Sequence, residues 1–185
     1  MPCQLTISKP WVGLHGIWDD GGNTVCKLLN AMGVKYYLPK YEVNPFSARL
    51  KDKMPFMPHE VMKGIRPNLV CHSAGGLMAK RLMDSGQEFG TIFLFGSAMD
   101  RDTEFDSSKY DKIYNIYCRK DKALLLGAWM LLHPFGGMGR AGYKGKSPNV
   151  INVEASFKKT EIFQHSNYFL DENIQEWVNF CLDKA

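Results

Sequence analysis

Short apolar runs alternate with helical patterns along the chain, and this alternation limits the folds that it can adopt. Each run is bounded by glycine, proline or charged residues, so each predicts a buried strand. The predicted strands lie at residues 11–16, 34–38, 68–70, 91–96, 112–118 and 150–153. Alternating strands and helices are typical of an α/β fold, in which helices cover both faces of a mainly parallel sheet. We expect a three-layer sandwich with about six strands, forming a single domain over residues 1–185.

Residues 70–76 (V-C-H-S-A-G-G) connect one predicted strand to a helical pattern that continues to about residue 84. A serine at a sharp turn from strand to helix is typical of a nucleophile elbow, which lifts the hydroxyl clear of the sheet. Small flanking residues are required there, because the turn brings neighbouring backbones close together. The segment therefore predicts that Ser73 is a nucleophile, although a serine near glycine also begins many ordinary helices.

A serine hydroxyl is a weak nucleophile without a base, which is usually a histidine held by a carboxylate. Asp121 and His165 each follow a predicted strand further along the chain, in the order serine, acid, histidine. Ligand sites of parallel sheets lie at the carboxyl ends of the strands, so we expect these residues to meet there. Asp100 is an alternative acid, because it also follows a strand. A surface ion pair with the neighbouring lysines is the other interpretation of Asp121.

The carbonyl that a serine attacks also needs N–H donors for its developing negative charge. The N–H of Ala74, directly after the serine, is one candidate, and the N–H of Ile17, after His15 and Gly16, is the other. Losing one such donor typically costs about 3 kcal/mol of transition-state stabilisation. We expect His15 to brace this loop, and His72 to pack and hydrogen-bond behind the elbow, rather than to transfer protons.

Taken together, these segments resemble a small α/β-hydrolase of the serine esterase or lipase type, without a large cap domain. The resemblance rests on residues 14–17 (L-H-G-I), 71–76 (C-H-S-A-G-G), 119–121 (R-K-D) and 165–169 (H-S-N-Y-F). It implies the α/β-hydrolase fold with Ser73 as nucleophile, His165 as base and Asp121 as the orienting acid. It also implies an oxyanion hole formed by Ile17 and Ala74.

Cys71 departs from the family pattern, because it replaces the first glycine of G-x-S-x-G. We expect it to be a buried small side chain rather than an alternative nucleophile. The five cysteines are widely spaced and form no C-x-x-C pair, which argues against a disulfide framework or a zinc site. We see no signal peptide and no apolar stretch near the ~20 residues of a membrane helix, so we expect a cytoplasmic protein.

Residues 122–149 are an insertion or a partial lid in this interpretation, with an apolar part followed by a glycine-rich part. Residues 137–142 match G-x-G-x-x-G, but no convincing strand precedes them, so we expect a flexible loop rather than a dinucleotide site. Four apolar residues are candidates to line an acyl site, although core packing explains them equally well. They are Trp18, Met130, Leu131 and Phe135.

The leading hypothesis is a serine hydrolase that cleaves a carboxylic ester or thioester through an acyl-enzyme on Ser73. An acyltransferase using the same residues and a non-catalytic binding protein that kept the elbow are the alternatives. The expected partner is a small-molecule acyl ester or thioester, and no metal or organic cofactor is required. A net charge of +4 with dispersed basic residues does not indicate nucleic-acid binding. The oligomeric state is left open.

Overall fold

The computed structural model describes residues 9–16, 24–41, 64–129, 136–157 and 164–185. Within these ranges six strands form one sheet in the order β2-β1-β3-β4-β5-β6, and every neighbouring pair is parallel. The strands are β1 (Trp11–Leu14), β2 (Tyr36–Tyr37), β3 (Asn68–His72), β4 (Phe89–Phe95), β5 (Tyr110–Tyr117) and β6 (Val150–Glu154). The predicted α/β architecture is confirmed, and the described sheet is entirely parallel.

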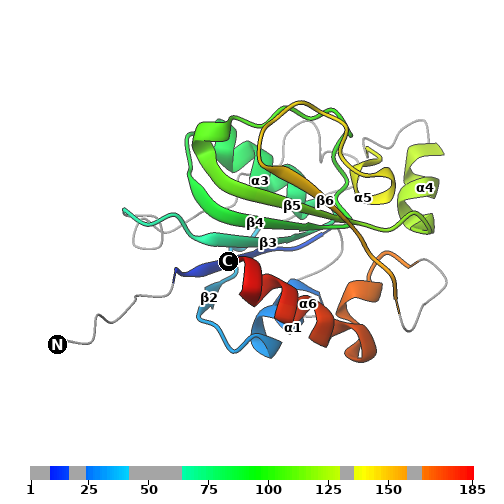
Figure 1. The fold of residues 1–185 in the computed structure, drawn as a ribbon, viewed down its shortest axis with the longest axis horizontal. Coiled ribbons are helices and arrows are strands. Elements are labelled where there is room, and N and C mark those ends of the chain that lie inside the picture. The colour runs from blue at the N-terminus through cyan, green and yellow to red at the C-terminus, as the bar shows by residue number, and fades with distance from the viewer. Residues whose placement is uncertain (1–8, 17–23, 42–63, 130–135, 158–163) are drawn as a thin grey trace.

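Helices cover both faces of this sheet. They are α1 (Val25–Ala31), α3 (Gly75–Asp84), α4 (Lys122–Trp129), α5 (Met138–Ala141) and α6 (Asp171–Lys184), with 3₁₀ helices at Ser107–Lys109 and Asn167–Phe169. Figure 1 shows α1 and α6 on one face and α3 on the other, with α4 and α5 near the end of β5. The sequence also predicts a helix beginning near residue 58, which lies outside the described residues. Among the helices that are described, none is long and apolar enough to cross a membrane.

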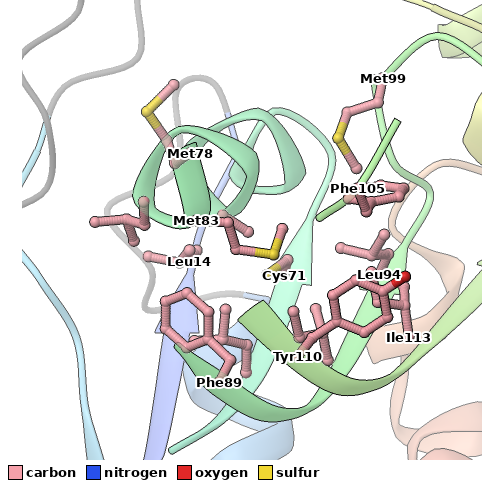
Figure 2. Close-up of a cluster of buried hydrophobic side chains, with 14 of the residues drawn as sticks. Leu14, Cys71, Met78, Met83, Phe89, Leu94, Met99, Phe105, Tyr110 and Ile113 are labelled. Carbon is pink, nitrogen blue, oxygen red and sulfur yellow. The ribbon is translucent and has the colours of Figure 1, made fainter. Parts of the chain in front are cut away.

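Strand β4 illustrates why the sheet is buried on both faces. Its side chains alternate, so Ile92 and Leu94 enter the core beneath α3, whereas Phe93 and Phe95 enter the core beneath α1 and α6. Figure 2 shows the core on the α3 side, where Cys71 lies among the buried side chains. A continuous apolar strand of this kind is typical of a parallel sheet covered on both faces.

Charged side chains gather at the amino end of the sheet, where β3, β4 and β5 begin. Arg66 donates to Asp111 at 2.7 Å and to Glu88 at 2.9 Å. Lys9 lies 3.2 Å from Asp111, and Lys109 lies 3.4 Å from Glu88. These partly exposed residues connect the starts of three strands at the end of the sheet opposite Ser73.

Candidate active site

Ser73 lies at the turn between β3 and α3, with a backbone φ of 55°. That left-handed conformation is rare for a residue with a side chain and costs roughly 1–2 kcal/mol. Backbone hydrogen bonds hold the turn in place. The N–H of Ser73 donates to Phe95 O at 3.0 Å, and its carbonyl oxygen accepts from the N–H of Ala98 at 3.1 Å. The serine is therefore fixed at the carboxyl end of β4, in the conformation of an elbow.

Two glycines allow the chain to pass close to this turn. A Cβ atom on Gly75 would overlap the carbonyl oxygen of Leu14, so α3 begins directly against β1. A Cβ atom on Gly16 would lie 3.0 Å from Ser73 Cβ and 3.5 Å from its Oγ. The loop after β1 thus passes immediately beside the serine hydroxyl.

Cys71 occupies the position before His72 and is 1 % exposed. Its side chain belongs to the core beneath α3 (Figure 2). Because successive side chains of a strand point to opposite faces, it lies on the other face of β3 from His72. Burial raises the pKa of the Cys71 thiol well above its ordinary value. A buried thiol of this kind is a poor nucleophile, because the thiolate is the reactive form.

His165 and Asp121 form a direct pair at the same end of the sheet. His165 Nδ1 lies 2.6 Å from Asp121 Oδ2, and Asp121 is 0 % exposed. The second carboxylate oxygen, Oδ1, accepts from the N–H of Leu124 at 3.0 Å. A carboxylate accepts hydrogen bonds, so Nδ1 of His165 is the donor and its Nε2 is left as a proton acceptor.

This geometry distinguishes Asp121 from Asp100, the two acids that the sequence offers as partners of His165. The complete burial of Asp121 is incompatible with a surface ion pair to its lysine neighbours, which are themselves exposed. Asp100 lies at the surface, and its backbone oxygen accepts from the N–H of Thr103 at 3.2 Å. The structure pairs Asp121 with His165.

The ring of His165 and the turn at Ser73 meet at the carboxyl end of β4. Gly96 follows Phe95, the acceptor for Ser73 N–H, and a Cβ atom on Gly96 would lie 3.3 Å from His165 Cε1. The ring of His72, the residue before Ser73, lies 4.8 Å from the ring of His165. Ser73, Asp121 and His165 therefore belong to one cluster around the carboxyl ends of β3, β4 and β5.

The remaining predicted site residues fall into two groups. Ala74 is buried at the start of α3, and none of the described residues accepts a hydrogen bond from its N–H. Ile17, Trp18, Met130, Leu131 and Phe135 lie outside the described residues.

His15 holds the loop after β1, as the sequence predicts, but the contribution of Tyr41 to this contact was not predicted. His15 Nδ1 donates to the oxygen of Gly16 at 2.9 Å, and the His15 ring stacks on Tyr41 with centroids 4.3 Å apart. The Tyr41 hydroxyl donates to the His15 backbone oxygen at 2.8 Å. No local pattern marks Tyr41 for this contact, because it is 26 positions away in the chain.

The glycine-rich segment is also organised differently from the expected flexible loop. Met138 is 0 % exposed, and residues 138–141 form the short helix α5. Gly139 donates to the backbone oxygen of Ser97 at 2.8 Å, and a Cβ atom on Gly139 would overlap the backbone of Gly96. The expectation was wrong because the glycine spacing serves close packing against the turn after β4.

No group of three or more His, Cys, Asp or Glu side chains in the described ranges is arranged to hold a metal ion. The same ranges contain four of the cysteines, all as free thiols, namely Cys26, Cys71, Cys118 and Cys181.

Comparison with known proteins places this geometry in context. No protein-family model matches the chain, and no curated protein matches it. Among solved structures, the chain is similar to a predicted CIB-like hydrolase from Thermoplasma acidophilum, with a TM-score of 0.54 and 13% identity over 98% of this chain and 87% of that one. It is also similar to carboxyl esterase 2 from Tuber melanosporum, with a TM-score of 0.52 and 10% identity over 94% and 76% of the two chains. Together with the strand order and the elbow at Ser73, these likenesses show that the chain has the α/β-hydrolase fold.

Proposed function

We propose that the chain is a serine hydrolase that cleaves a carboxylic ester or thioester through an acyl-enzyme on Ser73. The observation that carries the proposal is the pair formed by buried Asp121 and half-buried His165, which lies beside the strained turn of Ser73. An elbow alone is a weak motif. A histidine whose Nδ1 is held by a buried carboxylate, next to that elbow, is the arrangement that activates a serine hydroxyl.

In the proposed reaction, Nε2 of His165 takes the proton from Ser73 Oγ as that oxygen attacks the acyl carbonyl. The N–H groups of Ala74 and Ile17 stabilise the negative charge on the carbonyl oxygen. His165 then gives its proton to the departing alcohol or thiol, which leaves the acyl group on Ser73. A water molecule, deprotonated by His165, releases the carboxylic acid and restores the serine.

Asp121 has two tasks in this scheme. Its Oδ2 fixes the tautomer of His165 so that Nε2 is the atom presented to the serine. Its negative charge also stabilises the imidazolium that forms after proton transfer. The N–H of Leu124 holds the carboxylate in place from the other side, at 3.0 Å.

The ester or thioester substrate is chosen because its carbonyl suits this chemistry. The similarity in fold to a carboxyl esterase agrees with that choice. We propose that Trp18, Met130, Leu131 and Phe135 line the acyl site, as the sequence predicts. Residues 122–149 remain a predicted insertion or partial lid.

The test uses a short-chain p-nitrophenyl ester and a fluorophosphonate probe. The wild-type protein should hydrolyse the ester and be labelled by the probe, whereas Ser73→Ala should lose nearly all of both properties. Unchanged hydrolysis by Ser73→Ala would overturn the assignment of the nucleophile. Absence of labelling in folded wild-type protein would instead favour a non-catalytic binding protein. Acyl transfer to an added alcohol or amine in preference to water would identify an acyltransferase.

A further inference from the structure

His72 is the last residue of β3 and the immediate neighbour of Ser73, and it is 4 % exposed. Its Nε2 lies 3.1 Å from the backbone oxygen of His165. A carbonyl oxygen only accepts hydrogen bonds, so Nε2 of His72 carries a proton and donates it. In the neutral ring Nδ1 then has no proton, and none of the described residues donates to it.

The bare Nδ1 atom argues against a role in packing alone. A buried acceptor without a donor is unfavourable, and an apolar side chain of similar shape avoids that penalty. Histidine adds one contact that an apolar side chain lacks, namely the hydrogen bond from Nε2 to the loop that carries His165. The benefit of His72 therefore lies in that bond.

The two histidine rings are also in contact. Their centroids are 4.8 Å apart, and their planes are tilted by 40°. Asp121 holds Nδ1 of His165, while His72 holds the backbone oxygen of His165 and packs against its ring. This combination leaves Nε2 of His165 as the ring nitrogen that is available to Ser73. It is the atom that the proposed reaction uses.

We propose that His72 is a positioning residue that fixes the loop and ring of His165 relative to Ser73. The inference rests on the proposed function, because it gives His72 a role in presenting the proposed base. The bond joins His72 to His165, 93 positions later in the chain, and since His72 and Ser73 are consecutive it ties the proposed base to the proposed nucleophile.

The environment of His72 is consistent with this role. Burial, and after it the neighbouring His165, lower the pKa of His72 to about 3. The ring is therefore neutral at the pH of an ordinary esterase assay. It does not compete with His165 for the serine proton, and it places no positive charge beside the imidazolium that forms there.

The experiment compares His72→Asn with His72→Gln, which carry the same amide on side chains of different length. The amide nitrogen of glutamine comes near the position of Nε2, whereas that of asparagine stops near Nδ1. We expect His72→Asn to lower kcat about tenfold or more with little change in KM, because a misplaced catalytic group is costly. His72→Gln should stay within about threefold of the wild type. Cys71→Ala is the matched control, because the Cys71 side chain lies in the core beneath α3, on the other face of the sheet. This substitution should leave kcat unchanged.

A second measurement does not depend on turnover. The proton shared by His165 Nδ1 and Asp121 Oδ2, which are 2.6 Å apart, should give a far-downfield proton NMR signal. We expect this signal in the wild type and in His72→Gln, and its broadening or loss in His72→Asn at an unchanged circular dichroism spectrum. Should His72→Asn not fold, His72→Phe takes its place, because it keeps a ring and removes the donor.

Wild-type kcat and an unchanged downfield signal in His72→Asn, or in His72→Phe where that replaces it, would overturn the positioning role. The proposed function fails separately, through a wild-type protein that neither hydrolyses esters nor reacts with the fluorophosphonate. In that event the NMR signal still decides whether His72 positions His165.

Discussion

At the amino end of the sheet charged side chains pair with one another near the surface, whereas at the carboxyl end polar groups are buried and backbones are crowded. Arg66 contacts both Glu88 and Asp111, and all three side chains are more than a third exposed. At the other end Asp121 is 0 % exposed.

The carboxyl end also contains local features that oppose stability. Ser73 has a left-handed backbone, and glycines there contact neighbouring backbone atoms so closely that a Cβ atom would overlap them. Among the described residues, no partner satisfies His72 Nδ1 or the hydroxyl of Tyr168. Burial raises the pKa of Tyr168 well above its ordinary value, and the nearby Asp121 adds to this effect.

The difference shows where this fold tolerates local structure of unfavourable free energy. Strain and unsatisfied buried polar groups persist only where the surrounding structure enforces them, and they concentrate at functional sites. At the amino end Asn149, directly before β6, also has a left-handed backbone, but asparagine tolerates that conformation, and the charged side chains there pair near the surface. We therefore expect substitutions at the carboxyl end to change activity strongly, and substitutions at the amino end to change stability slightly and activity not at all.

The largest effect should come from Asp121→Asn, with Asp100→Asn as its matched control. Replacing the carboxylate that holds His165 favours the wrong tautomer and should lower kcat by roughly a thousandfold or more. Asp100→Asn, at the surface of the same end, should retain nearly full activity. Kinetics on a short-chain ester measure both, and a larger loss in Asp100→Asn would show that we have chosen the wrong acid.

The second effect concerns the loop beside Ser73. Gly16→Ala places a methyl group 3.0 Å from Ser73 Cβ and 3.5 Å from Oγ, so the hydroxyl loses part of its approach to a substrate. We expect kcat/KM to fall roughly 10- to 100-fold, the range typical of a displaced catalytic group. Gly137→Ala, where a Cβ atom would meet only the Arg101 side chain at 3.8 Å, is the control. Equal activity of the two variants would show that the loop after β1 does not contribute to the active site.

Much of the fold is predictable from the sequence because its elements are long and periodic. The apolar run of β4 and the spacing of Ile174, Trp177, Val178 and Cys181 in α6 identify buried elements without any tertiary information. Predicted ends shift by one or two residues, as at Tyr110, where β5 begins before the expected residue 112. Strand ends depend on pairing with neighbours, which a local pattern does not contain.

The site is less predictable, since its contacts join distant segments. The sequence puts both Asp121 and Asp100 after strands, and only packing shows which of them lies 2.6 Å from His165. The catalytic roles themselves remain predictions. The bond from His72 to His165 and the contact of Gly139 with Gly96 connect separate loops, so no spacing rule reveals them.

The third effect is on stability at the carboxyl end. Gly139→Ala forces a methyl group against the backbone of Gly96 and Ser97, which cannot move without breaking the turn after β4. Overpacking of this kind typically costs about 1–3 kcal/mol of unfolding free energy. Gly137→Ala, two residues earlier, should change it by less than about 0.5 kcal/mol. Urea unfolding measures both, and equal stability of the two would contradict the close packing of α5.

The smallest effect should come from Arg66→Gln at the amino end. It removes a cation from two carboxylates that are partly exposed, and exposed pairs contribute about 1 kcal/mol or less. Ester hydrolysis should be unchanged, since Arg66 lies at the opposite end of the sheet from Ser73. A large loss of activity would contradict the expectation that substitutions at the amino end of the sheet leave activity unchanged.

The pH dependence of this small effect has a definite sign. Hydrogen bonds from Arg66, and after it Lys109, lower the pKa of Glu88, and those from Arg66 and Lys9 outweigh burial to lower the pKa of Asp111. A carboxyl group whose pKa is lower in the folded state contributes stability above its unfolded pKa and loses it as the pH falls through the folded pKa. The difference in unfolding free energy between wild type and Arg66→Gln should therefore be present at neutral pH and shrink below about pH 4. Urea unfolding at a series of pH values measures this, and a difference that grows in acid would exclude the ion pairs as its source.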